Sequence, residues 1–273
     1  MTTAALASTL LVTMKRYDLE VDRKGRDGWF GGRPPGIKST QWPRSRNTGL
    51  PMVHVLTLTL PPDYRRKGPE YEGIALFQAH DVEASEVDGV AEVLDGTRTI
   101  SGKDDAFFAE IAKAASGKHP TERVWTEPDI GFALLWLTAE ELAGKPARLP
   151  REIRHEDVEE EPCAWDAEAD RERIRLCVVD DPNTGKAPRE LMEGEAAREN
   201  EYVPYFTMAE PLQQRLGYAK NHLGGTFTPP GNLDIPAGMT PYVLELNDVA
   251  GANLAGGGLL LDLEAETLCW AGG

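Results

Sequence analysis

The stretch Val53-His54-Val55-Leu56-Thr57-Leu58-Thr59-Leu60 decides the fold class, because its composition and its period are those of a β-strand. It is rich in β-branched residues, and its apolar positions alternate with His and Thr, so one face is expected to be buried. Pro61-Pro62 follows and ends the strand. Similar runs predict strands at Gly73–Phe77, Gly89–Leu94, Ile130–Leu137, Ile174–Val179, Tyr242–Leu246 and Gly258–Leu263.

Helix signals are fewer. An apolar stripe of Phe107, Phe108, Ile111, Ala114 and Ala115 follows a candidate cap at Asp104. Thr138-Ala139-Glu140-Glu141 and Thr207-Met208-Ala209-Glu210 match a capping box, with Gly217 as a stop after the second. Pro188 to Asn200 is expected to be a surface helix. The sequence therefore predicts an α+β protein with mixed, mainly antiparallel sheets and peripheral helices, as one domain over residues 1–273.

Two parts of the chain share an order of glycines and prolines. In the first, Gly31-Gly32-Arg33-Pro34-Pro35-Gly36 leads through Pro51 into the strand at residue 53, and Gly73 opens the next strand. In the second, Gly224-Gly225 and Pro229-Pro230-Gly231 lead through Pro241 into a strand, and Gly258 opens the next. This order predicts an internal duplication with two pseudo-equivalent half-sheets.

The chain is strongly acidic and its charge is unevenly placed. Lys and Arg number 29 against 45 Asp and Glu, a net charge of −16, although residues 1–70 carry +6. The densest acidic region is residues 150–205, which hold 17 of the 45 Asp and Glu residues. A surface of this sign repels phosphate backbones and anionic lipid and attracts basic partners. We therefore expect no nucleic-acid or membrane role and a basic protein partner, with acidity for solubility alone as the alternative.

Cysteines and apolar runs bear on the compartment. Cys163, Cys177 and Cys269 are odd in number and widely spaced, which suits reduced thiols better than a disulfide framework. The apolar run from Ala4 to Val12 has no basic residue before it, unlike a signal peptide. No run approaches the roughly 20 apolar residues of a membrane span. We expect a cytoplasmic protein.

Three motifs near the N-terminus carry a family resemblance. Trp29-Phe30-Gly31-Gly32-Arg33-Pro34, Trp42-Pro43 and Gly49-Leu50-Pro51-Met52 before a long strand resemble the YwqG-like family of bacterial proteins. Near the C-terminus, His222-Leu223-Gly224-Gly225 and Gly256-Gly257-Gly258-Leu259 are similar to the family's later motifs. The resemblance covers residues 28–80 and 218–273 and leaves the acidic middle region, 150–205, unmatched.

The resemblance implies a mixed α/β single domain with internal pseudo-symmetry, but the family has no agreed activity. Some members lie near genes for secreted toxins. Two departures concern polar residues. The family's Leu-Ala-Gln-Ile phrase reads Val55-Leu56-Thr57-Leu58 here, and its Trp-Gly-Asp phrase near the C-terminus is replaced by Leu254-Ala255-Gly256.

Candidate motifs for chemistry are weak. Asp181-Pro182-Asn183-Thr184-Gly185-Lys186 lacks the first glycine and the final hydroxyl of a phosphate loop, so we interpret it as a β-turn. His54 is expected to be a sheet residue with a hydrogen-bonded ring. His155 beside Glu156 and Asp157 could help to bind a divalent cation, but a solvated charged face is the better interpretation. We expect no catalytic residue, cofactor or metal.

The function predicted best is binding to another protein. Its most specific form is a cytoplasmic immunity protein that occludes a basic bacterial toxin, because carboxylates steer association with basic surfaces. Trp29 and Trp42 flank the first glycine loop and either close one end of the sheet or form a binding patch. The alternatives are a hydrolase or transferase with a cleft between the two halves, and a scaffold. The residues expected to face the partner are Glu156, Asp157, Glu159, Glu160, Glu161, Asp166, Glu168, Glu190, Glu193, Trp29 and Trp42.

Overall fold

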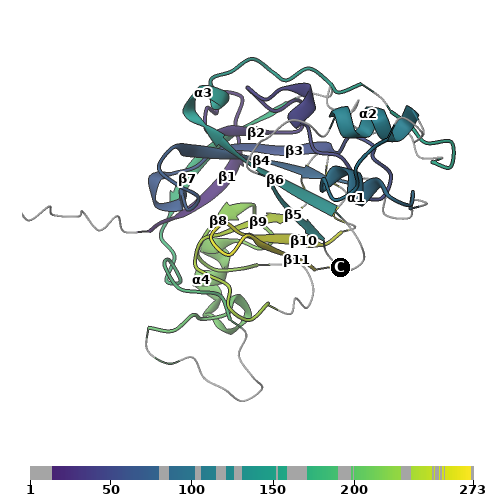
Figure 1. Cartoon of the computed structure of the whole chain (residues 1–273). Helices are drawn as coiled ribbons and strands as arrows, with labels where there is room; N and C mark the ends of the chain where they lie inside the picture. The colour runs from purple at the N-terminus through teal and green to yellow at the C-terminus, as the bar shows by residue number, and fades with distance from the viewer. Residues whose placement is uncertain are drawn as a thin grey trace, which may run out of the picture.

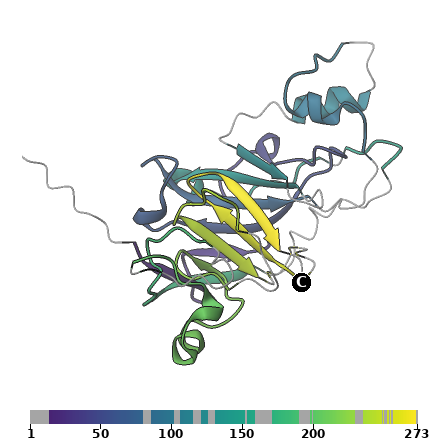
Figure 2. The same cartoon turned by 90° about the horizontal axis from the view of Figure 1, so that it is seen from below.

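A curved antiparallel sheet forms the centre of the protein (Figures 1 and 2). The computed structural model describes residues 14–79, 86–101, 106–114, 121–125, 131–151, 153–158, 171–189, 198, 200–228, 235–247, 249, 252, 254 and 256–271. Within them the sheet has 11 strands in the order β11-β10-β9-β8-β1-β7-β2-β3-β4-β6-β5. Every neighbouring pair is antiparallel. The predicted α+β class therefore holds in a sheet-dominated form.

The strands come from almost the whole length of the chain. Their bounds are β1 Arg16–Val21, β2 Gly28–Phe30, β3 Val53–Thr59, β4 Tyr71–Gln78, β5 Thr121–Trp125, β6 Gly131–Thr138, β7 Glu172–Val179, β8 His222–Leu223, β9 Val243–Asn247, β10 Gly258–Asp262 and β11 Thr267–Ala271. The sheet curls so that its two end strands, β5 and β11, approach each other. In Figure 1 the strands β8 to β11 consequently lie below β2, β3, β4 and β6.

The inner face of this curl holds the main hydrophobic core. Leu56 and Leu58 of β3, with Trp136 of β6, pack in one cluster with Leu244 of β9 and Leu259 of β10. All five are at most 1% exposed. Fully burying one such side chain stabilises a fold by about 1.5–3 kcal/mol. Because both halves of the sheet contribute side chains, the strands β3 and β6 share one core with the C-terminal strands β9 and β10.

The opposite, outer face is also covered over β4 and β6. Phe77 and Leu135 pack there against Trp42 and Met52 from the loop before β3. Two-sided burial explains why β4 and β6 have nearly continuous apolar runs instead of a strict alternation.

Helices are short and lie outside the sheet. Their bounds are α1 Val90–Leu94, α2 Ala106–Ala114, α3 Ala139–Leu142 and α4 Glu210–Leu216. Among the described residues, 3-10 turns occupy Ser39–Gln41, Pro62–Tyr64 and Tyr205–Thr207. Figure 1 shows α1 and α2 at one end of the sheet and α4 at the other. None of the helices within the described ranges is long and apolar enough to cross a membrane.

The helix predictions had mixed outcomes. The α2 stripe is confirmed, since Phe107, Phe108 and Ile111 are buried. The capping box at Thr138 is also confirmed, and its hydroxyl accepts the Glu141 N–H at 3.2 Å. The proposed cap Asp104 and most of the expected helix Pro188–Asn200 lie outside the described residues.

Two local predictions were wrong. Gly89–Leu94 contains helix α1 and no strand, because Gly89 takes a left-handed φ of 90° that begins a helix, with Val90 and Val93 buried on one side. The second capping box does not form. Thr207 belongs to the 3-10 turn and its hydroxyl donates to the Pro204 carbonyl, so α4 begins without a side-chain cap and ends, as expected, at Gly217.

The two glycine pairs enter the sheet with the same register. The N–H of Gly31 donates to the Val55 carbonyl at 2.9 Å, and the N–H of Gly224 donates to the Val243 carbonyl at 2.7 Å. All four glycines of the two pairs have φ between 63° and 80°, a region that favours glycine. The residues before them are also matched, as Phe30 lies opposite Leu56 and Leu223 opposite Leu244.

Candidate functional site

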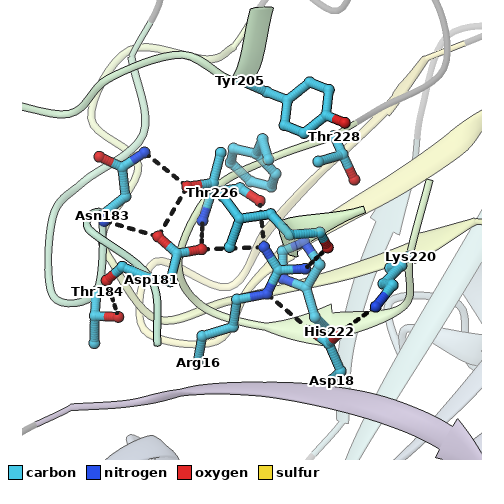
Figure 3. A network of polar contacts seen from close by, with 12 residues as sticks. Arg16, Asp18, Asp181, Asn183, Thr184, Tyr205, Lys220, His222, Thr226 and Thr228 are labelled. Carbon is cyan, nitrogen blue, oxygen red and sulfur yellow. Dashed lines mark hydrogen bonds and ion pairs between the residues drawn. The ribbon is translucent and has the colours of Figure 1, made fainter. Parts of the chain in front are cut away.

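A cluster of charged and polar side chains lies buried on the outer face of β1, β8 and β9 (Figure 3). Strand alternation explains its position: Leu19, Leu223 and Leu244 point into the core, so their neighbours point the other way. Asp18 lies opposite His222, and His222 lies opposite Glu245, so these three residues form one row across the sheet. The chain on either side of β8, residues 200–220 and 224–228, lies over the row, and we call it the covering segment.

Arg16 is the centre of the cluster and is fully buried. Its Nε donates to Oδ1 of Asp18 at 2.8 Å, and its Nη1 donates to Oδ2 of Asp181 at 3.0 Å. The remaining donors reach backbone carbonyls of the covering segment, Thr226 at 3.3 Å and Leu216 at 3.2 Å. A buried cation with two carboxylates and two carbonyls is well compensated for the loss of water.

Asp181 and Asn183 join the turn after β7 to the covering segment. Asp181 accepts hydrogen bonds from the N–H of Thr226 at 2.8 Å, the Thr226 hydroxyl at 2.8 Å and the Asn183 N–H at 2.7 Å. The Asn183 side chain donates to the Val203 carbonyl at 2.7 Å and accepts from its N–H at 2.9 Å. The predicted β-turn is confirmed, since the Thr184 N–H donates to the Asp181 carbonyl.

His222 and Glu245 form the other half of the cluster. His222 Nε2 lies 2.8 Å from Oε2 of Glu245, and both side chains are at most 1% exposed. Neither ring nitrogen of His222 makes a hydrogen bond within the described part of the chain, so the contact with Glu245 is one of close approach. Glu245 also accepts from the Thr228 N–H at 3.0 Å and from Nδ2 of Asn247 at 2.9 Å.

Chemically, a histidine beside a carboxylate is the pair that general acid–base catalysis uses. Here the covering segment encloses both groups, so a substrate cannot reach the imidazole in this conformation. The cluster reaches solvent through Lys220, whose half-exposed side chain donates to Oδ2 of Asp18 at 3.0 Å. The arrangement is suited above all to fixing the covering segment on the sheet.

Two exposed aromatic rings, Phe206 and Tyr218, lie beside the buried ring of Tyr205 on that covering segment. Tyr205, Phe206 and Tyr218, which we call the aromatic surface, have ring centroids 5.3 to 6.1 Å apart. Phe206 is 68% and Tyr218 50% exposed. Gln213 holds the base of the group, because its side-chain amide donates to the carbonyls of Tyr205 and Met208 at 2.9 and 3.0 Å.

Basic side chains near the aromatic surface are already paired. Arg215 contacts Asp180 at 3.2 Å, and Arg189 contacts Glu201 at 2.8 Å. Lys186 donates to the Glu201 carbonyl at 3.0 Å, and the Arg198 N–H donates to the Glu201 carboxylate. Glu201, the residue before Tyr202, thus contacts both Arg189 and Arg198. These two arginines are the described residues on either side of the acidic stretch 190–197.

Most of the acidic residues predicted to face a partner are Glu159, Glu160, Glu161, Asp166, Glu168, Glu190 and Glu193, which lie outside the described residues. Glu156 and Asp157 lie in a turn, where His155 Nδ1 is 3.3 Å from the Asp157 carboxylate. The His155 ring packs against Phe107 at 5.0 Å. Within the described ranges no three His, Cys, Asp or Glu side chains gather to hold a metal.

The two tryptophans occupy different surroundings. Trp42 is 2% exposed, donates from Nε1 to the Met52 carbonyl at 2.8 Å and meets Phe77 edge to face. This burial favours its packing role. Trp29 is partly exposed, donates to the Arg33 carbonyl at 3.3 Å and carries the Arg171 guanidinium over its ring at 4.1 Å.

His54 is a sheet residue with both ring nitrogens bonded, as predicted. Nδ1 lies 3.0 Å from the Gly31 carbonyl and Nε2 lies 2.8 Å from the Thr57 hydroxyl. Burial lowers the pKa of His54 to about 4, which keeps the ring neutral at physiological pH.

An open hollow of about 630 Å³ lies between residues 36–39 and residues 140–148. The Glu141 side chain at its edge is used by the Thr138 cap, where it accepts from the Thr138 N–H at 2.8 Å. The hollow therefore lacks a free carboxylate at that position.

Sequence reasoning missed the roles of Arg16, Asp18, Asp181, His222 and Glu245 as one cluster. Single charged residues between apolar neighbours, such as Glu245 in Val243-Leu244-Glu245-Leu246, were the available signal. Comparison with known proteins adds no relative: no family model, no curated protein and no solved structure matches the chain.

Proposed function

We propose that this protein acts by binding another protein, and that its partner is a basic bacterial toxin which it neutralises in the cytoplasm by direct occlusion. The observation that carries the proposal is the aromatic surface of Tyr205, Phe206 and Tyr218. Large aromatic rings held out into solvent are the side chains that most often supply binding energy at protein interfaces.

The rigidity of the base supports this role. The aromatic surface lies on the segment that Arg16, Asp181 and Asn183 fasten to the sheet through buried bonds. Side chains held in place before binding lose little conformational entropy when a partner arrives. A buried ionic cluster beneath an exposed aromatic group is therefore a reasonable scaffold for recognition.

The charge of the same region favours a basic partner. Residues 180–228 carry eight Asp and Glu against five Lys and Arg. Each of the five basic side chains already contacts a carboxylate or a carbonyl. The stretch therefore carries a net charge of −3, which favours encounter with a basic surface.

We also propose an internal duplication and membership in the YwqG-like family. The matched registers of the glycine pairs at Gly31 and Gly224 support the duplication. The next strands support it too, as Gly73 lies opposite Thr59 and Gly258 lies opposite Asn247. Under this proposal β2, β3 and β4 correspond to β8, β9 and β10.

A second candidate is a hydrolase or transferase that uses His222 as the acid–base group with Glu245. Only their 2.8 Å contact favours it, and the covering segment would have to move to admit a substrate. Loss of a measured hydrolytic activity in His222→Gln, with folding retained, would favour this candidate over the binding role.

Affinity capture from a bacterial lysate, at low and at high salt, tests the binding role. We expect one stoichiometric basic protein that wild type retains at low salt and releases at high salt, and that Phe206→Ala fails to capture. Val178→Ala is the matched control, because Val178 is 60% exposed on β7 and by strand alternation points to the opposite face from Val179, which packs beside Tyr205. A captured protein that Phe206→Ala retains equally well would contradict the proposed surface. The captured protein should be toxic when expressed alone and harmless when co-expressed with wild type.

A further inference from the structure

Two arginines occupy matching places in the two parts of the sheet. Arg16 immediately precedes Tyr17, which lies opposite Leu223. Arg171 immediately precedes Glu172, which lies opposite Phe30. Leu223 and Phe30 each come directly before a glycine pair. Arg16 is the first residue of β1 and Arg171 directly precedes β7, so both arginines lie where a strand begins beside such a pair. This match depends only on strand register.

Both arginines also lie against the second glycine of their pair. A Cβ added to Gly225 would come within 2.9 Å of Cδ of Arg16, and one added to Gly32 would come within 2.5 Å of Cγ of Arg171. In each place the missing side chain leaves room for the arginine stem. The two guanidinium groups are therefore delivered to the outer face by the same local geometry.

The two guanidinium groups differ in what neutralises them. Arg16 has the carboxylates of Asp18 and Asp181 at 2.8 and 3.0 Å. Arg171 stacks on the Trp29 indole at 4.1 Å, and within the described part of the chain no carboxylate pairs with it. Asp18 lies two residues after Arg16, opposite His222. The residue at the matching position after Arg171 is Arg173, which lies opposite Trp29. A carboxylate site that is filled at Arg16 is thus left open at Arg171.

The surroundings of Arg171 suit an anion. Arg173 adds a second positive charge, in a chain whose net charge is −16. Stacking on an indole fixes the plane of a guanidinium and leaves its edge available for two parallel hydrogen bonds to a carboxylate. The ammonium group of a lysine could not offer this planar, bidentate hydrogen-bonding geometry.

We propose that Arg171, stacked on Trp29 beside Gly32, is a binding site for a carboxylate group of an external ligand, either a free organic acid or an acidic side chain of a protein. The carboxylate of the ligand would neutralise Arg171 as Asp18 and Asp181 neutralise Arg16. It does not depend on the aromatic surface or on the basic partner, so either proposal can fail while the other holds.

Nuclear magnetic resonance of the full chain tests the site through the Trp29 indole N–H signal, assigned with Trp29→Phe. Sodium acetate is titrated against sodium chloride at constant ionic strength. We expect a saturable shift with acetate alone. In Arg171→Gln the affinity should fall about ten-fold or more, since hydrogen bonds to a charged group are lost.

Arg175→Gln is the matched control, because Arg175 is an exposed arginine of the same strand, paired with Glu20 and Asp22. It should leave acetate binding unchanged. Arg171→Lys keeps the positive charge but should bind acetate more weakly than wild type. This variant separates bidentate hydrogen bonding from electrostatic attraction alone.

Three results would overturn the proposal. They are an equal response to chloride, unchanged binding in Arg171→Gln, and binding that is seen only when Asp166, Glu168 and Asp170 are replaced by their amides. The last result would show that the chain's own acidic stretch occupies Arg171. Succinate and a short glutamate-containing peptide then distinguish the two sources of carboxylate. Tighter binding of succinate indicates a free organic acid, and tighter binding of the peptide indicates an acidic side chain of a protein.

Discussion

Nη1 of Arg16 lies 3.0 Å from Oδ2 of Asp181, 165 residues away in the sequence, and neither side chain has any exposed surface. This contact joins the first strand of the sheet to the turn after β7. The same carboxylate holds Thr226, so one residue connects three distant parts of the chain. The pair is therefore central to the order of the segment that carries the aromatic surface.

Replacing Asp181 with Asn should strongly destabilise the protein. Arg16 would keep its positive charge in a buried place with one of its two carboxylates removed, and breaking a buried ion pair in this way costs about 3–5 kcal/mol. Urea unfolding followed by circular dichroism should show a lower midpoint.

Asp180→Asn is the control for this prediction. Asp180 is the neighbouring residue, its side chain is 89% exposed, and it pairs with Arg215 in solvent. An exposed pair of this kind is worth about 0–1 kcal/mol. Equal destabilisation by the two variants would contradict the importance assigned to the buried pair.

Much of the sheet could be predicted because its central strands carry long apolar runs. The strands β3, β4 and β6 are buried on both faces, so their sequences are distinct from loops. The strand β2 has only three residues, and β8 only two, which is too short for a periodic signal. The strand β1 does alternate, but half of its positions are charged: Arg16 and Asp18 belong to the buried cluster, and Glu20 is exposed.

The buried cluster could not be predicted in the same way. Its hydrogen bonds join residues up to 210 positions apart, as in the bond from Arg16 to the Thr226 carbonyl, and only the strand order brings them together. A charged residue in a strand is usually a solvent-facing one. Nothing local indicates that Glu245 is covered, because the covering residues belong to another part of the chain.

The stability of the protein should depend on pH through His54. Burial lowers the pKa of His54 in the folded protein to about 4, whereas the ring in the unfolded chain titrates near 6.5. Between these values the unfolded chain binds more protons, so the free energy of unfolding should decrease as the pH falls from 6.5 to 4. The loss from this one group is about 3 kcal/mol.

His54→Gln separates this effect from the titration of carboxylates. Glutamine can still bond to the Gly31 carbonyl and the Thr57 hydroxyl but does not titrate. The variant should be less stable than wild type at pH 7, and the difference should shrink as the pH is lowered to 4. Urea unfolding at several pH values measures this difference, and parallel curves for the two proteins would contradict the prediction.

The two cysteines within the described ranges should differ in reactivity. Burial raises the pKa of Cys269 to about 12, so only about one thiol in 10,000 is ionised at pH 8. The pKa of Cys177 is also raised, first by burial and then by its contact with Glu20, but the thiol lies on the accessible outer side of β7. Iodoacetamide labelling followed by peptide mass spectrometry should therefore modify Cys177 before Cys269. In urea the two should react at equal rates.

Gly225 should be hard to replace, because it borders the buried ion pair. It has a φ of 80°, and a Cβ there would lie 2.6 Å from Oδ2 of Asp181 and 2.9 Å from Cδ of Arg16. Gly185 has a similar φ of 76° but open space around the added atom, so Gly185→Ala should cost only the backbone strain of about 1–2 kcal/mol. Gly225→Ala adds displacement of the ion pair to the same strain, and its loss of stability in urea unfolding should approach that of Asp181→Asn. Because both changes disrupt one contact, the double variant should be little less stable than either single variant, whereas additive losses would show that Gly225 and Asp181 act independently.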